Sequence, residues 1–464
     1  MSQTLEVLAP FDQRVIDTIA MHNAAEVESA LAKAHQLYKD RSSWIPKHER
    51  IAILEKAMAI MQSQVEELTL MAAAEGGKPY GDSRVEVFRA INSVKIAIEE
   101  MGQFAGEEIP MGHTASSVNR MAFTRKEPIG VVVSVSAFNH PLNLIVHQTI
   151  PAIAVGTPVI VKPALTTPRS CIRFVEILKE AGLPDGWCEY LITSNEDAEK
   201  LVTDSRVNFF SFIGSARIGW LLRSKLSPGT RCALEHGGAA PAIIDQGVDL
   251  DDIVPPLMKG GFYHSGQVCV SVQRVFAHQS IIGELADKMV AAAKKLKVGD
   301  PRLPETECGP LILPREVDRV SQWVNEAVNE GAELRCGGRK ISESLYEPTL
   351  LLNPAHDSKV SREEIFGPVV CLYSYENYED AIHLANDLPF AFQASVFTQN
   401  LDKAIDISQQ LNAAAVMIND HTAFRVDWMP FGGRDASGLG MGGIRYSMED
   451  MSREKMIVFK SKHL

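Results

Sequence analysis

The most apolar stretch of the chain, residues 129–162, contains two β-branched runs at 129–136 and 157–161. Neither run alternates between apolar and polar residues, which is typical of parallel strands that are covered on both faces. Between the runs, polar residues such as Asn139 and Gln148 interrupt the apolar character. The pattern therefore predicts the buried interior of an α/β protein and not a membrane span.

A helix is predicted directly after the second run. Thr167 is a candidate N-cap, Pro168 fits the first helical turn, and Gly182 and Pro184 would end the helix. Apolar residues recur at intervals of three and four, which gives this helix one buried stripe. The stripe contains Cys171, Phe174, Val175 and Leu178.

The same alternation of strands and helices continues along the chain. Apolar runs at 187–192 and 207–213 enclose a polar helix, so this region predicts a βαβαβ unit of the doubly wound type. After Glu235 the alternation restarts, and a second α/β unit is predicted. Its strands are expected at 240–244, near 369–372 and at 414–418, and its long helices at 281–296 and 315–330. Two segments fit neither unit: a polar, β-branched one at 113–125 and a terminal strand candidate at 455–461.

Length and composition fit a soluble enzyme of two or three domains. The 464 residues are 45% apolar and 22% charged, which is ordinary for globular proteins. A formal net charge of −12 argues against nucleic acid or an anionic membrane surface as a partner. The seven cysteines form no CxxC pair, and the N-terminus has no charged region followed by an apolar one. We therefore expect a cytoplasmic protein in a reducing compartment, without a signal peptide.

Three residues carry candidate chemistry. Cys269 lies in FYHSGQVC, Glu235 lies 34 residues upstream in ALEHGG, and Asn139 lies in SAFNHP. A thiol nucleophile with a separate carboxylate suits a reaction that forms a thioester and then hydrolyses it. Taken singly, Cys269 could be a small buried hydrophobe, Asn139 a turn residue and Glu235 a surface glutamate at a strand end.

Seven motifs occur in the order and approximate spacing of the aldehyde dehydrogenase superfamily, which the chain resembles over nearly its whole length. The motifs are IGVVVSVSAFNHP, PVIVKPA, FIGSARIG, ALEHGG, GQVC, EEIFGP and MPFGG. The runs at 259–269 and 424–433 are most similar to those of the lactaldehyde dehydrogenase-like branch. The resemblance implies NAD(P)-dependent oxidation of an aldehyde to a carboxylate through a thiohemiacetal and a thioester on Cys269. Glu235 would activate the hydrolytic water, and Asn139 with the Cys269 backbone N–H would form an oxyanion hole.

The resemblance also assigns roles to the predicted units. A doubly wound dinucleotide-binding domain would cover 1–112 and 126–235, and a catalytic α/β domain would cover 236–444. Segments 113–125 and 445–464 would form a small oligomerisation sheet through which a homodimer or homotetramer assembles. The resemblance implies no metal site.

The cofactor, NAD or NADP, would bind at FIGSARIG, where a strand ends at Gly214 and Ser215 and the amides of the next helix can face a pyrophosphate. The other cofactor residues that the resemblance implies are Phe138, Lys162, Glu364 and Phe366. The run GLGMGG at 438–443 matches a phosphate-binding pattern, but no βαβ unit follows it, so we interpret it as a decoy. Leu165 stands where NAD-selective relatives carry a glutamate, so NADP should be tolerated, and Arg169 could favour it.

A polar substrate funnel is predicted on the helix that opens after SAFN. One face of this helix would carry His140, Asn143 and His147, which are spaced by three and four residues. Arg425 should approach the same space from a loop. These groups predict a small polar or anionic aldehyde as the substrate. The alternative is that they hydrogen-bond to one another, with Asp427 as the internal partner of Arg425.

Two other functions stay open. A CoA-acylating semialdehyde dehydrogenase would resolve the thioester with a thiol, but it would not need the base that Glu235 supplies. A cysteine-dependent hydrolase would pair Cys269 with His264, five residues away, without an Asn or Asp at a family-typical spacing. Two residues depart from the family pattern: His236, which is either a second titrating group or a packing substitution, and Asp435, which replaces a common lysine.

Overall fold

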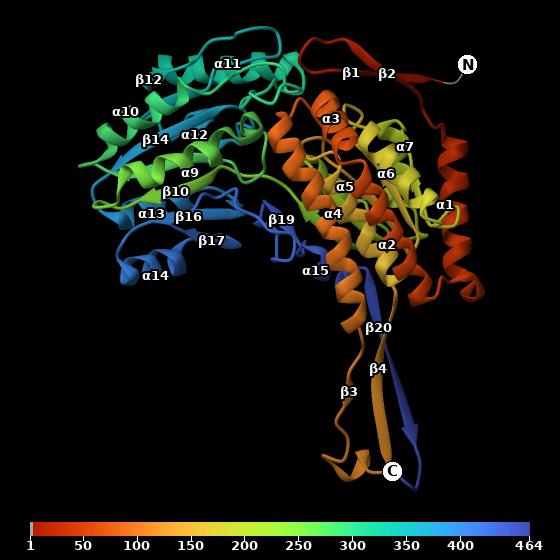
Figure 1. The fold of residues 1–464 in the computed structure, drawn as a ribbon. Helices are drawn as coiled ribbons and strands as arrows, with labels where there is room; N and C mark the ends of the chain where they lie inside the picture. Colours follow the sequence, from red (N-terminus) through yellow and green to blue (C-terminus); the bar gives the residue numbers. More distant parts are fainter. Residues whose placement is uncertain (1–2) are drawn as a thin grey trace.

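A computed structural model describes residues 3–464 and contains two large sheets and a protruding smaller one (Figure 1). The first large sheet has the strand order β19-β9-β8-β5-β6-β7, and its strands are parallel except for β19, which is antiparallel to β9. These strands are β5 (Val131–Val135), β6 (Val159–Lys162), β7 (Cys188–Tyr190), β8 (Val207–Ile213), β9 (Arg231–Glu235) and β19 (Gly438–Leu439). The predicted βαβαβ unit is therefore confirmed.

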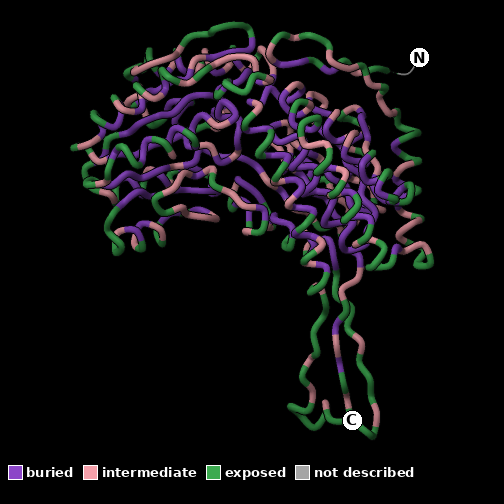
Figure 2. The backbone as a smooth tube through the Cα atoms, viewed as in Figure 1, coloured by how far each residue is buried: buried purple, intermediate pink, exposed green. Residues whose placement is uncertain are grey.

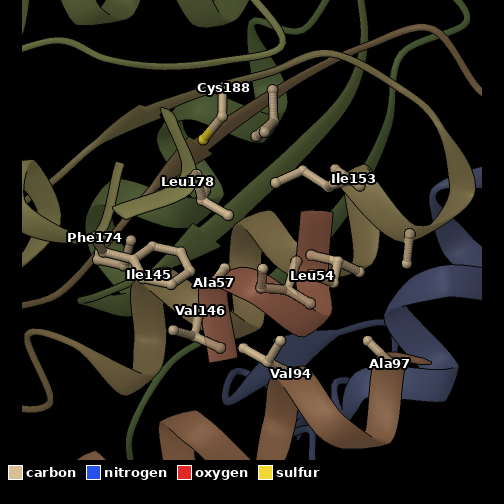
Figure 3. Close-up of a cluster of buried hydrophobic side chains, with 14 of the residues drawn as sticks. Leu54, Ala57, Val94, Ala97, Ile145, Val146, Ile153, Phe174, Leu178 and Cys188 are labelled. Carbon is tan, nitrogen blue, oxygen red and sulfur yellow. The ribbon is translucent and has the colours of Figure 1, made fainter. Parts of the chain in front are cut away.

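Helices cover both faces of this sheet, as the unbroken apolar runs predict. Val132 packs with one cluster and its neighbours Val131 and Val133 with the other, because successive side chains point to opposite faces of a strand. One cluster, part of which Figure 3 shows, includes Leu54, Val94, Val146, Phe174 and Leu178. The helices around the sheet are α1 (Ala24–Lys39), α2 (Lys47–Ser63), α3 (Val65–Gly76), α4 (Tyr80–Gln103), α5 (Asn143–Val155), α6 (Arg169–Glu180), α7 (Asn195–Thr203), α8 (Ala216–Ser224) and α15 (Ile444–Asp450).

Helix α6 has the predicted buried stripe but not the predicted cap. Thr167 is buried, and its hydroxyl has no hydrogen-bond partner among residues 3–464. Instead the carboxylate of Glu75, at the end of α3, accepts from the backbone N–H of Arg169 at 2.7 Å and of Ser170 at 2.8 Å. The Thr167 prediction was wrong because a distant carboxylate satisfies the helix N-terminus better than a local hydroxyl.

The second large sheet has the order β12-β13-β14-β11-β10-β16-β17, with only β12 antiparallel. Its strands are β10 (Ala240–Ile244), β11 (Val272–His278), β12 (Glu333–Cys336), β13 (Thr349–Leu352), β14 (Val369–Tyr375), β16 (Gln393–Phe397) and β17 (Ala415–Ile418). The helices on its two faces are α9 (Leu250–Phe262), α10 (Ile282–Ala293), α11 (Pro314–Asn329), α12 (Lys359–Arg362), α13 (Tyr378–Asn386) and α14 (Leu401–Gln410). The predicted second α/β unit is present.

A three-stranded arm projects from the rest of the molecule (Figure 1). It consists of β3 (Glu108–Ile109), β4 (Arg120–Pro128) and β20 (Ser452–Lys460), and β20 pairs with β4 from Ser452↔Pro128 to Lys460↔Arg120. Most of its backbone is exposed or half-buried, as Figure 2 shows. The predicted terminal strand at 455–461 therefore exists and begins three residues earlier.

The remaining strands form two short pairs. They are β1 (Thr4–Leu8) with β2 (Val15–Ala20), and β15 (Phe390–Ala391) with β18 (Arg434–Asp435). Three 3₁₀ turns complete the chain: η1 (Arg41–Ser43), η2 (Ala115–Ser117) and η3 (Tyr263–Gly266). Within residues 3–464, no helix is both long enough and apolar enough to cross a membrane.

Candidate active site

A cavity of about 460 Å³ brings together residues from both large sheets. Asn139, Glu235 and Cys269 all line it, although they are far apart in the sequence. Asn139 follows β5, Glu235 ends β9, and Cys269 lies between η3 and β11. The three predicted catalytic residues therefore meet at one place, and the volume lies in the range of small-molecule sites.

A strained turn precedes Cys269. His264 and Ser265 have φ values of 47° and 56°, and Gly266 follows with φ 71°. A side chain at Gly266 could not fit, because a Cβ there would lie 2.1 Å from the carbonyl oxygen of Gly367. Such strain persists only where the surroundings hold it, and here Ser265 Oγ donates to the Gly309 carbonyl at 2.7 Å. The turn thus fixes the position of the following thiol.

The environment of Cys269 opposes ionisation in the free protein. Burial, followed by the charges of Glu364 and Glu235, raises the pKa of the thiol to about 12, while the positive charge of Arg425 lowers it. The thiolate is the nucleophilic form of a cysteine. Among the charged groups that shift the pKa of Cys269, Arg425 is the cation that favours the thiolate.

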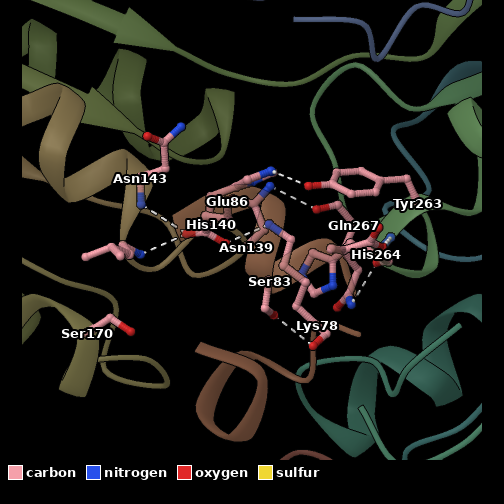
Figure 4. A network of polar contacts seen from close by, with 12 residues as sticks. Lys78, Ser83, Glu86, Asn139, His140, Asn143, Ser170, Tyr263, His264 and Gln267 are labelled. Carbon is pink, nitrogen blue, oxygen red and sulfur yellow. Dashed lines mark hydrogen bonds and ion pairs between the residues drawn. The ribbon is translucent and has the colours of Figure 1, made fainter. Parts of the chain in front are cut away.

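The amide of Asn139 is held beside the Cys269 segment. Its Nδ2 donates to the carbonyl oxygen of Gln267 at 2.9 Å, and Asn139 is 5% exposed. Glu86 in turn fixes the start of α5, since its Oε1 accepts from the backbone N–H of Leu142 at 2.9 Å and of Asn143 at 3.0 Å. Figure 4 shows this network, in which Glu86 also pairs with buried Lys78 at 2.7 Å. The second Nδ2 proton of Asn139 remains available for a substrate oxygen.

Glu235 occupies a space that the C-terminal glycine-rich loop provides. Gly438 pairs with Glu235 in the β19–β9 ladder. A Cβ on Gly442 would lie 2.1 Å from Glu235 Oε1, so a glycine is required there. Burial raises the pKa of Glu235, and the nearby charge of Arg425 lowers it. The GLGMGG run therefore makes room for the Glu235 carboxylate, a role that the decoy interpretation missed. Asp435, which departs from the family pattern, is exposed. It pairs with Phe390 between β18 and β15 and lies outside the cavity lining.

Several residues of the cavity fit a dinucleotide. Ser215 precedes α8 and makes no side-chain cap in the described part of the chain, so the first amides of α8 can bind an anion. Phe138 and Phe366 lie edge to face with ring centroids 5.7 Å apart. Glu364 Oε1 is buried without a hydrogen-bond partner among residues 3–464, and burial raises the pKa of this carboxyl to about 8. A buried, unpartnered carboxylate oxygen suits a hydroxyl donor such as a ribose.

The region around Leu165 differs from the expectation for Arg169. Arg169 Nε donates to Asp17 Oδ2 of β2 at 3.1 Å, so this guanidinium already has a carboxylate partner. Lys162 is 5% exposed at the end of β6 and lies outside the lining of the cavity. The prediction that Arg169 favours NADP is therefore not supported. The prediction that NADP is tolerated rests on Leu165 alone.

The predicted substrate face divides into two groups. His140 and Asn143 line the cavity, and His140 Nε2 lies 3.3 Å from Tyr263 Oη. His147 does not line it: its Nε2 lies 2.9 Å from Asp427 Oδ1. Burial lowers the pKa of His147 to about 4, so the neutral ring donates this hydrogen bond. Direct contact of His147 with a substrate is thus not supported, because the ring is committed to Asp427.

Arg425 lines the cavity without a carboxylate partner in the described chain. Its guanidinium carbon lies 3.6 Å from the centroid of the Phe431 ring, and its Nε is buried without a hydrogen bond within residues 3–464. Asp427, the expected internal partner, is taken by Arg89. Burial and the charge of Arg89 lower the pKa of Arg425, and Glu235 opposes this. A cation of this kind is suited to an anionic ligand.

His264 is not arranged as a base for Cys269. Its side chain is fully buried, both ring nitrogens lack partners among the residues described, and burial holds its pKa well below the usual value. The ring also lies outside the cavity lining. No group of three or more His, Cys, Asp or Glu side chains within residues 3–464 is arranged to hold a metal ion.

Comparison with known proteins defines the class. A sequence model of the aldehyde dehydrogenase family matches residues 1–457, and the chain belongs to this family. Among curated relatives, the 3-sulfolactaldehyde dehydrogenase of Priestia megaterium is 37% identical, with 98% of this chain and 95% of that protein aligned. The lactaldehyde dehydrogenase of Methanocaldococcus jannaschii is 34% identical, with 98% and 97% aligned. The predicted family and branch are therefore confirmed.

Solved structures agree with this assignment. Aldehyde dehydrogenase 21 from Physcomitrella patens, in complex with the reaction product succinate, has a TM-score of 0.95 and 35% identity over 99% of this chain and 95% of that one. Glyceraldehyde-3-phosphate dehydrogenase from Methanocaldococcus jannaschii, complexed with NADP, has a TM-score of 0.94 and 33% identity over 99% and 100%.

Proposed function

We propose that the protein oxidises a small anionic aldehyde to its carboxylate with NAD or NADP, and that water releases the product from a thioester on Cys269. The observation that carries the proposal is the meeting of Cys269, Asn139 and Glu235 in one cavity with Arg425, a half-buried cation that lacks a carboxylate partner in the described chain. Relatives named for sulfolactaldehyde and a relative with bound succinate support an anionic substrate.

The reaction begins when the thiol of Cys269 loses its proton to water and the thiolate attacks the aldehyde carbon, forming the anion of a thiohemiacetal. The carbonyl oxygen becomes negative, and the amide of Asn139 with the Cys269 N–H would stabilise it, each donor contributing about 3 kcal/mol. A bound nicotinamide would supply the acceptor for the hydride that leaves this carbon as the C=O bond of the thioester forms. Phe138 and Phe366 would orient the ring, Glu364 would accept from a ribose hydroxyl, and the amides after Gly214 and Ser215 would bind the pyrophosphate.

Glu235 completes the reaction by accepting a proton from water, which attacks the thioester carbon. The C–S bond breaks, the carboxylate leaves, and Cys269 is regenerated. The raised pKa of Glu235 makes it a stronger base than an ordinary carboxylate, which suits the removal of a proton from water. A CoA-acylating reaction has no use for this base, so hydrolysis is favoured.

The proposal is tested by following reduced-cofactor absorbance with NAD and NADP over a panel of anionic and neutral aldehydes, with and without CoA. We expect oxidation of an anionic aldehyde without CoA, and its loss in Cys269→Ala with cofactor binding retained. A strict requirement for CoA would favour the acylating alternative, and turnover by Cys269→Ala would exclude the covalent mechanism.

We also propose that the arm made of β3, β4 and β20 mediates a homodimer or homotetramer. Large apolar side chains of β20 are exposed: Met456 at 58%, Val458 at 47% and Phe459 at 47%. Exposed apolar clusters of this kind are typical of protein interfaces. Sedimentation of wild type against Val458→Glu tests it, and a monomeric wild type would contradict it.

A further inference from the structure

His236 is a buried histidine inserted between the candidate base and the candidate pyrophosphate loop. It directly follows Glu235, is 1% exposed and lines the cavity. Its ring lies between Phe212 and Trp220, with centroids 5.7 Å from each, and approaches both edge to face. A Cβ on Gly219 of α8 would lie 1.9 Å from His236 Cε1, so this glycine makes room for the ring.

The protonation of His236 follows from its partners. Nδ1 lies 2.9 Å from the carbonyl oxygen of Gly214, which can only accept, so Nδ1 carries the proton. Nε2 is buried and has no partner within residues 3–464. Burial lowers the pKa of His236, although the bond to Gly214 opposes this, so the ring is neutral with its proton on Nδ1.

The dipeptide Glu235–His236 therefore holds both backbone polar groups of Gly214. The N–H of Gly214 donates to the Glu235 carbonyl at 3.1 Å, and the Gly214 carbonyl accepts from His236 Nδ1. The backbone N–H of His236 donates to the carbonyl oxygen of Ser437 at 2.9 Å. This bond anchors the dipeptide from the other side. One short segment thus ties the end of β8 and the start of α8 to the residue that carries the base.

We infer that His236 is a positioning residue: its Nδ1–H holds the Gly214–Ser215 turn in the conformation that presents the first amides of α8 to the cofactor pyrophosphate. This inference rests on the proposed cofactor site. A side chain that only filled space between Phe212 and Trp220 would need neither the hydrogen bond nor a polar ring. The unpartnered Nε2 is the cost of using a histidine here, since a buried acceptor without a donor is unfavourable.

Two substitutions separate positioning from packing. His236→Leu keeps most of the volume and removes the donor. His236→Asn places its Nδ2 near the position of Nδ1 and so keeps the donor, but it leaves a void beside Phe212 and Trp220. His236→Leu should therefore lose cofactor affinity but little stability, whereas His236→Asn should lose stability but little cofactor affinity.

The experiment is calorimetric titration of the purified full chain with NAD and with NADP, together with its thermal unfolding midpoint in the absence of cofactor. We expect His236→Leu to unfold near the wild-type temperature and to bind the preferred cofactor about 3- to 10-fold more weakly, as for the loss of one neutral hydrogen bond. His236→Asn should unfold at a lower temperature and bind with a Kd within about twofold of wild type. The KM for cofactor should rise in His236→Leu while the KM for aldehyde does not.

Wild-type affinity in His236→Leu would overturn the inference, and so would equal weakening in both variants, which would make ring volume the cause. Should His236→Leu not fold, His236→Gln replaces it, because its amide lies near Nε2 and cannot reach Gly214. It should then bind more weakly than His236→Asn, and equal Kd values would overturn the inference. Absence of binding by the wild type would instead contradict the proposed function.

Discussion

Half-buried Arg89 and buried Asp427 form a two-pronged ion pair, with Nη2–Oδ1 at 2.7 Å and Nε–Oδ2 at 3.1 Å, although 338 residues separate them. His147 adds a third donor to the same carboxylate at 2.9 Å. The pair satisfies Asp427 and leaves Arg425, two residues earlier, with its charge directed at the cavity. Because Asp427 is paired with Arg89, Arg425 remains available to a substrate anion.

Asp427→Asn should destabilise the protein by about 3 kcal/mol, the lower end for a broken buried pair, because it leaves the half-buried Arg89 without its counter-charge. Burial opposes ionisation of Asp427, but His147 and Arg89 hold its pKa below the usual range. A lowered pKa stabilises the folded state above the unfolded pKa, near pH 4, and this stability is lost as the pH falls through the folded pKa. Urea unfolding from pH 3 to 7 should show a smaller acid loss in the variant.

The matched control for this prediction is Glu196→Gln, which breaks the exposed pair with Lys200. It should leave the free energy of unfolding nearly unchanged, since exposed pairs contribute little. A similar loss in both variants would show that the burial of Asp427 has no special effect.

Arg425→Met should reduce kcat/KM for a short anionic semialdehyde roughly ten- to hundredfold, because a charge-assisted contact of about 1.5–3 kcal/mol is lost. Propanal, which has no anion, should lose less, because only the higher pKa of the Cys269 thiol in the variant acts on it. Arg434→Met, which removes an exposed arginine outside the cavity lining, is the control. Equal losses with both aldehydes would show that Arg425 does not recognise the substrate anion.

Much of the fold could be predicted because its strands lie in the interior. Strands β8 and β10 match their predicted runs residue for residue, since helices cover both faces and most of their side chains are apolar, although Asn208 and Ser211 interrupt the run in β8. The candidate nucleophile, base and oxyanion residues were identified through motifs, which carry local backbone requirements such as the glycine before Gln267.

The rest of the site depends on long-range pairing that periodicity cannot reveal. Arg89 lies on α4 with no motif around it, and only the folded chain brings it to Asp427. The same holds for Glu75, which caps α6 from 94 residues away. For His147 the position on the helix face was predicted. Its hydrogen-bond partner, the carboxylate of Asp427, lies on a distant loop and was not.

Glu235→Gln should produce a pre-steady-state burst of reduced cofactor followed by slow turnover, because hydride transfer proceeds while water activation fails. Gly442→Ala should reproduce this signature, since its Cβ would lie 2.1 Å from Glu235 Oε1 and displace the carboxylate. Gly283→Ala, at an exposed position of α10 without a positive φ or atoms near the added Cβ, controls for the loss of a glycine. Proportional loss of burst and steady state would give Glu235 a role before the thioester.

Leu165→Glu should reduce NADP use about tenfold more than NAD use, because the new carboxylate repels a 2′-phosphate and can accept from a 2′-hydroxyl. Arg169 cannot offset this charge freely, since it is paired with Asp17 at 3.1 Å. Leu165→Gln is the uncharged control. An unchanged ratio of the two kcat/KM values would mean that Leu165 does not face the adenosine ribose.

The rate of Cys269 alkylation by iodoacetamide should rise about tenfold per pH unit from pH 7 to 10 without reaching a plateau. Burial raises the pKa of this thiol to about 12, and below the pKa the thiolate fraction grows tenfold with each unit. Arg425 lowers this pKa, so Arg425→Met should raise it and slow alkylation at every pH. The rate is measured by mass spectrometry of the Cys269 peptide, because the chain has six other free cysteines. A plateau below pH 9, or faster alkylation in Arg425→Met, would show that the cavity favours the thiolate through a group other than this arginine.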